Sequence, residues 1–427
     1  MSALSWVSVA VFLAAYTLIA TEKIHRVAAA LGGAGIMLLI HATGAEAAFF
    51  SEHSGIDWNV IFLLFGMMVI VGVLKETGVF EYLAIWAAKR ARGRPFRLMV
   101  LLVLITAGAS ALLDNVTTVL LIAPVTFLVC ERLAINPVPF LIAEAMASNI
   151  GGAATLVGDP PNIIIASRAG LTFNDFLIHM APMIIVLMAV FVGLCWLMFG
   201  RHFRYDPERA EEIMALDEKE AIADRRLLWQ SLAVLALVMA AFVLHPVLHY
   251  EPSVVALLGS GVLVAVTKVR TERAIAEVEW PTLVFFAGLF IMVGALVETG
   301  VIGALSEAAV AATAGRLELT TMGLLGASAV LSAIVDNIPY VATMSPIVEG
   351  LVEANGGHDV LWWALAFGAD LGGNATAVGA AANVVVLGIA ARNGTPISFW
   401  QFTKYGLIVT AVTVTLVGPY LWFRYLV

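Results

Sequence analysis

The chain has 427 residues, of which 61% are hydrophobic and 13% are charged, and its mean hydropathy is +0.96. Soluble globular proteins are about half apolar and about one quarter charged. The composition therefore excludes a soluble or nucleic-acid-binding protein and predicts an all-α polytopic membrane protein surrounded by the lipid bilayer. The formal net charge of −8 says little about function, because most charged residues lie between the apolar runs.

Apolar runs long enough, or nearly long enough, to cross a bilayer follow one another along the chain. We predict about ten transmembrane helices in the inner membrane of the cell. A stretch of mixed charge, 201–228, is expected to be a cytoplasmic linker. The predicted spans are 4–21, 27–43, 58–75, 140–167, 178–200, 229–247, 253–267, 281–298, 361–391 and 404–423.

Two further apolar regions, 98–130 and 320–350, each carry a polar break at the centre. Each half of these regions is short for a full span. We interpret both regions as re-entrant helical hairpins with an Asp-Asn pair at the tip; two ordinary spans with a polar kink are the alternative. The two pairs are Asp114-Asn115 and Asp336-Asn337.

The spans 140–167 and 361–391 are expected to be broken helices. Glycine weakens a helix interior, and proline removes a donor and clashes with the preceding turn. A break at mid-membrane is tolerated where it lines a cavity or is buried in protein, and in transporters it marks the binding site. The residues that interrupt the first of these spans are Gly151, Gly152, Gly158, Pro160 and Pro161.

The basic residues test this count of spans. If the amino terminus is outside and the hairpins do not cross, only Arg168, Arg316 and Arg424 of the 23 basic residues lie outside. Cytoplasmic loops are rich in Lys and Arg, so the distribution supports this topology, with both termini outside. The basic residues placed inside include Arg201, Arg204 and Lys268.

An internal repeat relates the two halves of the chain. Trp58 with Glu76-Thr77-Gly78 recurs 222 residues later as Trp280 with Glu298-Thr299-Gly300, and the two Asp-Asn pairs match at the same shift. Five crossings separate equivalent points, so the halves have opposite orientations and form inverted repeats. We predict a first repeat at 1–200, the linker at 201–228 and a second repeat at 229–427.

Carboxylates inside the apolar segments are the strongest functional signal. A charge at the bilayer centre costs about 2.5–3.5 kcal/mol on insertion scales, and no Lys or Arg is expected at the same depth. The match of the halves places Ala380 opposite Asp159 and Asn149 opposite Asp370. This asymmetry makes Asp159 and Asp370 the first candidates for proton coupling, with Glu144 as a weaker one that can equally be structural.

The hairpin tips and the helix breaks should converge on one acidic, amide-rich pocket. The Asp-Asn pairs could also serve only as caps of the half-helices, where Asp and Asn are preferred. We expect no metal site, no catalytic residue and no cofactor other than a proton or Na⁺ as the coupling ion. The predicted substrate- and ion-binding residues are Asp114, Asn115, Thr117, Thr118, Asn149, Thr155, Asn162, Asp336, Asn337, Asn374, Thr376 and Asn383.

The segments Leu113–Leu121 and Ser148–Asn162 together resemble the ArsB/NhaD and P-protein branch of the ion transporter superfamily. The resemblance implies a secondary transporter with two inverted repeats and two hairpins, and a homodimer as its assembly. This branch includes arsenite efflux permeases, Na⁺/H⁺ antiporters and relatives that carry dicarboxylates with Na⁺. For an arsenite permease, a cytoplasmic ATPase subunit is an expected partner. The Gly158–Asn162 run is nearer to the P-protein pattern.

Our leading hypothesis is proton-coupled efflux of arsenite and antimonite, which are small inorganic substrates. Arsenite at neutral pH is mostly the uncharged trihydroxide, which needs hydroxyl and amide partners and no cationic clamp. The alternatives are Na⁺/H⁺ antiport through the same carboxylates, transport of an anion or dicarboxylate, and a channel-like anion pathway. The sequence has no nucleophile–base or metal constellation, so we expect no enzyme.

Overall fold

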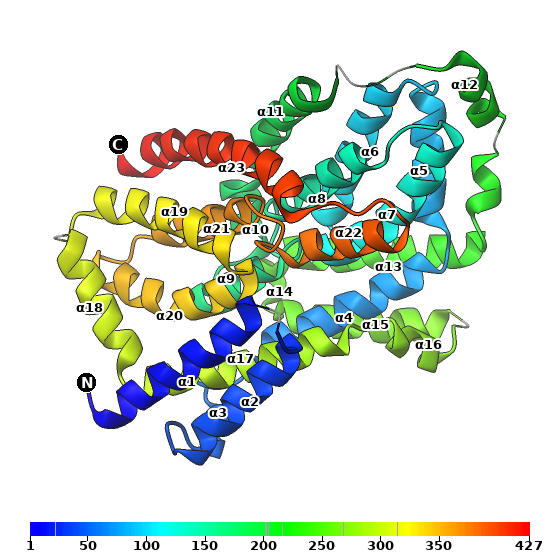
Figure 1. Ribbon diagram of the computed structural model, residues 1–427. Helices are drawn as coiled ribbons and strands as arrows, with labels where there is room; N and C mark the ends of the chain where they lie inside the picture. The colour runs from blue at the N-terminus through cyan, green and yellow to red at the C-terminus, as the bar shows by residue number, and fades with distance from the viewer. Residues whose placement is uncertain (22, 201–202, 204, 216, 268, 314) are drawn as a thin grey trace.

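The computed structural model describes residues 1–21, 23–200, 203, 205–215, 217–267, 269–313 and 315–427. These residues form helices and no strand, which confirms the predicted all-α fold (Figure 1). Three basic residues that were placed inside, Arg201, Arg204 and Lys268, lie outside the described residues.

The first half of the chain contains eleven helices, and two short helices follow it. Those of the first half are α1 (Ala3–Ala20), α2 (Arg26–Leu39), α3 (Ala45–Phe50), α4 (Trp58–Lys75), α5 (Val79–Arg90), α6 (Pro95–Ser110), α7 (Asn115–Arg132), α8 (Val138–Gly152), α9 (Pro160–Ala169), α10 (Phe173–His179) and α11 (Ala181–Phe199). The short helices in the linker region are α12 (Pro207–Met214) and η2 (Glu218–Ala221).

The second half repeats this order. Its helices are α13 (Arg225–Val243), α14 (His245–Leu248), α15 (Pro252–Val266), α16 (Thr271–Ala276), α17 (Trp280–Glu298), α18 (Val301–Thr313), α19 (Leu317–Ile334), α20 (Asn337–Ala354), α21 (Val360–Gly372), α22 (Ala381–Arg392), α23 (Phe399–Leu421) and η3 (Trp422–Leu426). The span predicted to begin at residue 229 starts earlier, at Arg225, because Asp224 caps the helix by accepting the N–H groups of Arg226 and Leu227.

Eight helices of the described chain are long and apolar enough to cross a membrane: α1, α4, α7, α11, α13, α17, α19 and α23. The predicted spans at α2 and α15 are shorter apolar helices, and the spans 140–167 and 361–391 are each divided into two, α8–α9 and α21–α22. The count of ten predicted crossings therefore differs from a count by helix length, since α7 and α19 are arms of the hairpins.

The two repeats are interlocked. Helix α4 of the first repeat packs on α15 of the second, and α17 of the second packs on α2 of the first. Backbones approach closely at both crossings: a Cβ added to Gly66 would lie 2.6 Å from the Ala256 carbonyl carbon, and one added to Gly288 would lie 2.9 Å from that of Ala30. Small residues at helix crossings allow this close packing in a membrane protein.

The same exchange occurs around the hairpins. Each hairpin packs on the broken helix of its own repeat, α6 and α7 on α8 and α19 and α20 on α21. The second segments cross over, because α7 also packs on α22 and α20 on α9. Residues from both repeats therefore meet where the hairpin tips and the helix breaks lie, in the middle of Figure 1.

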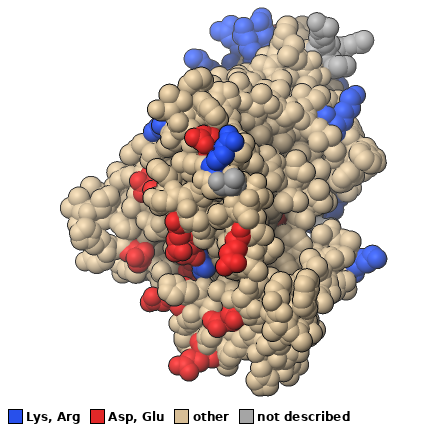
Figure 2. Space-filling model, turned by 90° about the vertical axis from the view of Figure 1, so that its left-hand side faces the viewer, with Lys and Arg blue, Asp and Glu red and all other residues tan. Residues whose placement is uncertain are grey.

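The two ends of the molecule differ in charge. Both termini and α18 lie on the left of Figure 1, whereas α5, α12 and α16 lie on the right. Figure 2 faces the left side, and Asp and Glu gather over its middle, with most of the visible Lys and Arg near the rim. This acidic face is the one that the basic-residue argument assigns to the outside, and the opposite face is called the inner face below.

Candidate ion and substrate site

A serine before each hairpin tip fastens the hairpin to the broken helix of its repeat. Ser110 donates to the carbonyl oxygen of Ser148 at 2.7 Å, and Ser332 donates to that of Ala369 at 2.6 Å. All four residues are fully buried. The two bonds occupy equivalent positions in the repeats, so they belong to a frame that both halves share.

Two threonines predicted to bind substrate also serve this frame. The Thr155 hydroxyl donates to the Ala111 carbonyl at 2.6 Å, and the Thr376 hydroxyl donates to the Ala333 carbonyl at 2.6 Å. Each hydroxyl donates its one proton to the backbone and also accepts a backbone N–H, from Gly158 at 3.1 Å for Thr155 and from Val378 at 3.3 Å for Thr376. These threonines tie the interrupted part of each broken helix to a hairpin tip.

The breaks themselves need glycine. A Cβ added to Gly158 would lie 2.4 Å from the Gly152 carbonyl oxygen and 2.7 Å from that of Ser110. In the second repeat a Cβ added to Gly379 would lie 2.7 Å from the Gly373 carbonyl oxygen. Both breaks therefore fold back on themselves at backbone contact distance, which only glycine permits.

Asp159 precedes α9 and is fully buried. Asn115 at the first hairpin tip donates to its Oδ2 at 3.0 Å. Asn337 at the second tip donates to both carboxylate oxygens, at 3.3 and 3.4 Å. The carboxylate thus receives one amide from each repeat, across 44 and 178 residues of sequence.

Asn149, near the end of α8, extends this cluster. Its Oδ1 accepts from Asn115 at 3.1 Å, and its Nδ2 lies 3.0 Å from the Oδ1 atoms of both Asn374 and Asn383. These four asparagines are buried, with at most 2% of their surface exposed. The amides form a chain that runs from Asp159 through Asn115 and Asn149 to the second break.

Asp370 on α21 is also fully buried, and neither of its oxygens has a hydrogen-bond partner among the described residues. Asn162 of α9 faces it and uses its own Nδ2 to donate to the Thr155 carbonyl at 3.0 Å. The Oδ1 atoms of Asn162 and Asn115 and the Thr118 hydroxyl are buried acceptors that likewise lack a partner. Buried charges are stable only when paired, so the Asp370 carboxylate favours a bound proton or cation.

Four helices begin at the cluster. Asn115 and Asn337 are the first residues of α7 and α20, Asp159 precedes α9, and Asn383 lies in the first turn of α22. The amino end of a helix carries a partial positive charge of about half a unit. These helix ends partly offset the negative charge of the carboxylates, and no Lys or Arg of the described chain hydrogen-bonds to the cluster.

Asp114 and Asp336 act as helix caps. Asp114 accepts the N–H of Thr117 at 2.8 Å, and Asp336 accepts that of Ile338 at 3.2 Å. The amides around Asp159 are hydrogen-bonded to that carboxylate and to one another, whereas Asp114 and Asp336 accept N–H groups at the starts of their own helices. Capping was the alternative reading of these pairs, and the binding roles predicted for Asp114, Thr117 and Asp336 stay predictions.

The prediction that no basic side chain reaches the depth of the carboxylates is wrong at Asp336. Nη1 of Arg26 lies 3.8 Å from its Oδ2, and the same guanidinium donates to Thr282 at 3.3 Å. Its Cζ also lies 5.5 Å from the centroid of the Phe285 ring. Because α2 packs on α17, a residue expected at the membrane surface reaches the second hairpin.

A cavity of about 360 Å³ surrounds this ion pair. It is lined by His25 before α2 and Arg26 at its start, by Asp336 at the hairpin tip and by Ala381 at the start of α22. Both members of the ion pair are partly exposed, 34% for Arg26 and 20% for Asp336. The second hairpin tip is therefore open to this cavity.

Glu144, the third residue predicted to carry a proton, lies apart from the cluster. Its Oε1 accepts from Thr126 of α7 at 2.6 Å, and its other oxygen has no partner in the described chain. No described hydrogen bond joins it to Asp159, Asp370 or the asparagines. The bond to Thr126 links α7 and α8 within the first repeat, which is a structural role.

Residues 16–368 match the family described as citrate transporter. The chain belongs to this family. An uncharacterized transporter of Mycobacterium tuberculosis is 58% identical over 99% of both chains, and the 46 kDa membrane protein of Mycobacterium leprae is 57% identical over 99% of this chain and 100% of its own. The human P protein is 33% identical over 97% of this chain, which spans 59% of the P protein.

Two solved transporter structures share the fold of this citrate transporter family member. The YdaH transporter of Alcanivorax borkumensis has a TM-score of 0.58 at 15% identity, with 99% of each chain covered. MtrF of Neisseria gonorrhoeae has a TM-score of 0.60 at 13% identity, covering 92% of this chain and 84% of its own. The chain is thus a multi-pass membrane transporter of the ion transporter superfamily and not an enzyme.

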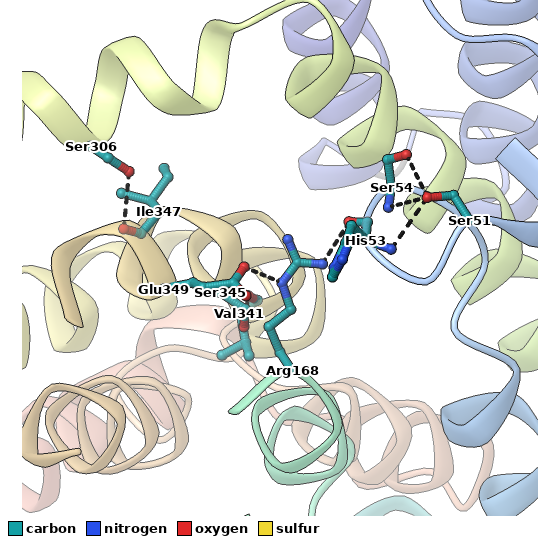
Figure 3. Close-up of polar contacts among 9 residues, drawn as sticks. All are labelled: Ser51, His53, Ser54, Arg168, Ser306, Val341, Ser345, Ile347 and Glu349. Atoms are coloured by element: carbon teal, nitrogen blue, oxygen red, sulfur yellow. Dashed lines mark hydrogen bonds and ion pairs between the residues drawn. The ribbon is translucent and has the colours of Figure 1, made fainter. Parts of the chain in front are cut away.

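A second cavity, of about 430 Å³, lies at the acidic face of this transporter. Figure 3 shows Arg168, at the end of α9, between Glu349 of α20 and His53 of the connection before α4. Its Nε donates to Glu349 at 2.7 Å and its Nη1 donates to the His53 carbonyl at 2.7 Å. Arg168 therefore ties the second hairpin, a broken helix and the α3–α4 connection together.

From the sequence, Arg26 was assigned to an inner loop and Arg168 to an outer loop, with no further role. Their partners are 310 and 181 positions away, and no local pattern indicates either pairing. The one available signal was their position beside a span end, where a long basic side chain can reach into the protein or toward the headgroups. Only the packing of α2 on α17 and of α9 on α20 decides between these directions.

Proposed function

We propose that this chain is a proton-coupled secondary transporter that exports a small, neutral, hydroxylated inorganic acid, arsenite or antimonite, across the inner membrane. Asp159 carries the coupling proton. Alternating exposure of the pocket to the two faces follows from the inverted repeats, as in other transporters with this symmetry. The homodimer and the cytoplasmic ATPase partner suggested by the resemblance are part of this proposal.

The observation that supports it is the amide cluster around one buried carboxylate. Asn115 and Asn337, which belong to opposite repeats, donate to Oδ2 of Asp159 at 3.0 and 3.3 Å. A proton on Asp159 would remove the charge that both amides hold in place, and the two hairpin tips would then be free to separate. Amides and hydroxyls that are released in this way match the hydroxyl groups of a neutral trihydroxide.

Na⁺/H⁺ antiport is the second candidate, and a specific feature favours it. Neither oxygen of Asp370 makes a hydrogen bond to a described residue, and the Oδ1 atoms of Asn162 and Asn115 and the Thr118 hydroxyl are likewise buried without one. Hard cations are bound by carboxylate, amide and hydroxyl oxygens. In this alternative, Na⁺ and protons would compete for the Asp159 and Asp370 carboxylates.

Transport of an organic carboxylate is a third candidate because of the family's description. The cationic group that could meet such a substrate is Arg26 in the inner cavity, which is already 3.8 Å from Asp336. The two buried carboxylates at the centre repel an anion unless a cation accompanies it. The geometry of the central cluster therefore supports the neutral substrate better.

Flux measurements in liposomes distinguish the three candidates. Purified protein is reconstituted with an imposed pH gradient, and arsenite, Na⁺ and citrate are each supplied while substrate uptake and internal pH are recorded. We expect arsenite to move against its gradient while protons move in the opposite direction. Proton movement driven by Na⁺ alone, or by citrate alone, would contradict the arsenite proposal and support the corresponding alternative.

Asp159→Asn tests the coupling role. We expect flux to fall to the level of empty liposomes while the protein remains folded, because the amide cannot carry the proton. Asp359→Asn is the matched control, since this exposed aspartate precedes α21 and makes no side-chain capping bond. Wild-type exchange by Asp159→Asn would overturn the assignment of the coupling site.

A further inference from the structure

A cavity of about 570 Å³ opens at the inner face, away from the central cluster. It lies where α4 and α15 end and where α13 begins, so the two repeats meet around it. Arginines from three places line it: Arg226 in the first turn of α13, Arg270 before α16 and Arg273 within α16.

The guanidinium groups in this cavity are available to a ligand. No ion pair or side-chain hydrogen bond joins those of Arg226 or Arg273 to another described residue, and Arg270 has only a 3.6 Å pair with the exposed Glu272. Of the two acidic residues in the lining, Asp224 is engaged with the backbone, because its Oδ1 accepts the N–H groups of Arg226 and Leu227 at 2.8 and 3.0 Å. Glu76 is the other acidic residue.

Exposed apolar side chains continue from the cavity toward the middle of the membrane. On α15 they follow the helical spacing of four residues: Val266 is 48% exposed, Val262 49% and Leu258 63%. On α13, Trp229 lies one turn after Arg226 and is 71% exposed. Tryptophan at this depth is typical of the membrane interface, and the apolar row on α15 is a surface for an acyl chain.

We propose that this cavity binds the phosphate headgroup of an anionic lipid of the inner leaflet. The three arginines hold the phosphate, and the acyl chains lie along Trp229 and the exposed residues of α15. A free phosphate would use the same guanidinium groups but would leave the apolar row without a ligand. The lipid therefore joins α13, α15 and α16 of the second repeat.

Native mass spectrometry of the full chain tests this inference, with phosphatidylglycerol as the probe and phosphatidylcholine as the neutral comparison. We expect one phosphatidylglycerol to remain bound under conditions that remove phosphatidylcholine. Arg226→Gln with Arg273→Gln should weaken this binding about 30-fold, since each basic residue near an anionic leaflet contributes roughly fivefold. Arg226→Lys with Arg273→Lys should retain most of it.

The matched control removes the same charge elsewhere on the inner face. Arg90 and Arg97 are exposed on α5 and α6, and Arg90→Gln with Arg97→Gln should leave phosphatidylglycerol binding unchanged. An equal loss in this control would overturn the proposal, because it would reveal only general attraction to anionic lipid. Equal retention of phosphatidylcholine, or binding of inorganic phosphate with no phosphatidylglycerol retained, would also overturn it.

Discussion

In the first repeat the chain enters the second part of its broken helix through Asp159, whereas in the second repeat it does so through Ala380. The preceding segments differ in the opposite sense, since α8 carries Asn149 at the position where α21 carries Asp370. Each repeat thus contributes one buried carboxylate to the cluster, but at a different position of the same frame.

The features that hold the frame are the same in both repeats. The serine bonds from the hairpins are 2.7 and 2.6 Å long, and the threonine bonds are both 2.6 Å. The repeats differ in the position of the buried carboxylate within this frame. The duplicated frame therefore supplies two equivalent positions for hairpins and breaks. The exchange of single residues gives one repeat a carboxylate held by amides and the other a carboxylate that makes no hydrogen bond to a described residue.

Among the variants that test this difference between the repeats, Asp370→Asn is expected to have the largest effect on transport. The variant makes the second repeat like the first at this position, and it should abolish coupled transport while the folded protein survives. The physical reason is that an amide can neither release a proton nor bind a cation as a carboxylate does. Proton-coupled flux in liposomes measures it, and a wild-type rate would mean that Asp159 alone carries the coupling ion.

The breaks should differ in their tolerance of a methyl group. Gly158→Ala should destabilise the fold by about 1–3 kcal/mol or more, because its Cβ meets two backbone oxygens that cannot move aside. Gly379→Ala should cost less, since the closest contact of its added Cβ is longer, 2.7 against 2.4 Å. Thermal unfolding in detergent compares them with Gly388→Ala, whose Cβ has nothing within 4 Å.

If Gly158→Ala and Gly388→Ala unfolded at the same temperature, the first break would be looser than its backbone contacts indicate. If Gly379→Ala were instead the most damaging of the three, the second break would carry the tighter constraint. Either result would contradict the order that we expect from the contact distances.

The serine bonds should contribute equally to the two repeats. Ser110→Ala and Ser332→Ala should each lower the free energy of unfolding by about 1 kcal/mol, the net value of a typical buried hydrogen bond. Each variant leaves one of two equivalent backbone carbonyls, that of Ser148 or that of Ala369, without its side-chain donor. Reversible unfolding in mixed detergent measures both, and a difference of several kcal/mol between them would break the equivalence of the two frames.

The smallest effect is expected at the two cysteines. Cys130 and Cys195 are buried in α7 and α11, and neither is part of the amide cluster. Cys130→Ser with Cys195→Ser should therefore still transport, as measured by the same flux assay. Loss of arsenite flux in a variant that remains folded would show that thiols, and not only amides and carboxylates, handle the substrate.

Local chemistry made several features predictable. Asp-Asn pairs favour a helix start, so the hairpin tips fall at Asp114 and Asp336, and the Gly and Pro residues after Ser148 place the first break correctly. The assignment of a transporter fold follows from these motifs and from the repeat. The candidate site residues Asn115, Asn149 and Asp159 could be grouped for the same reason, since all lie at a tip or a break.

Caps, glycines and prolines act on their immediate neighbours, so the sequence alone indicated the hairpin tips, the helix breaks and the repeated halves. Several helix starts, such as that of α13 at Arg225, differ from the predicted bounds. The packing of α7 on α22 and of α20 on α9, which lets Asn337 donate to Asp159, arises only in the folded chain. Folding also brought Arg26 to Asp336 and left Glu144 with Thr126. Such pairings depend on which helix faces are buried together, and no short stretch of sequence encodes that choice.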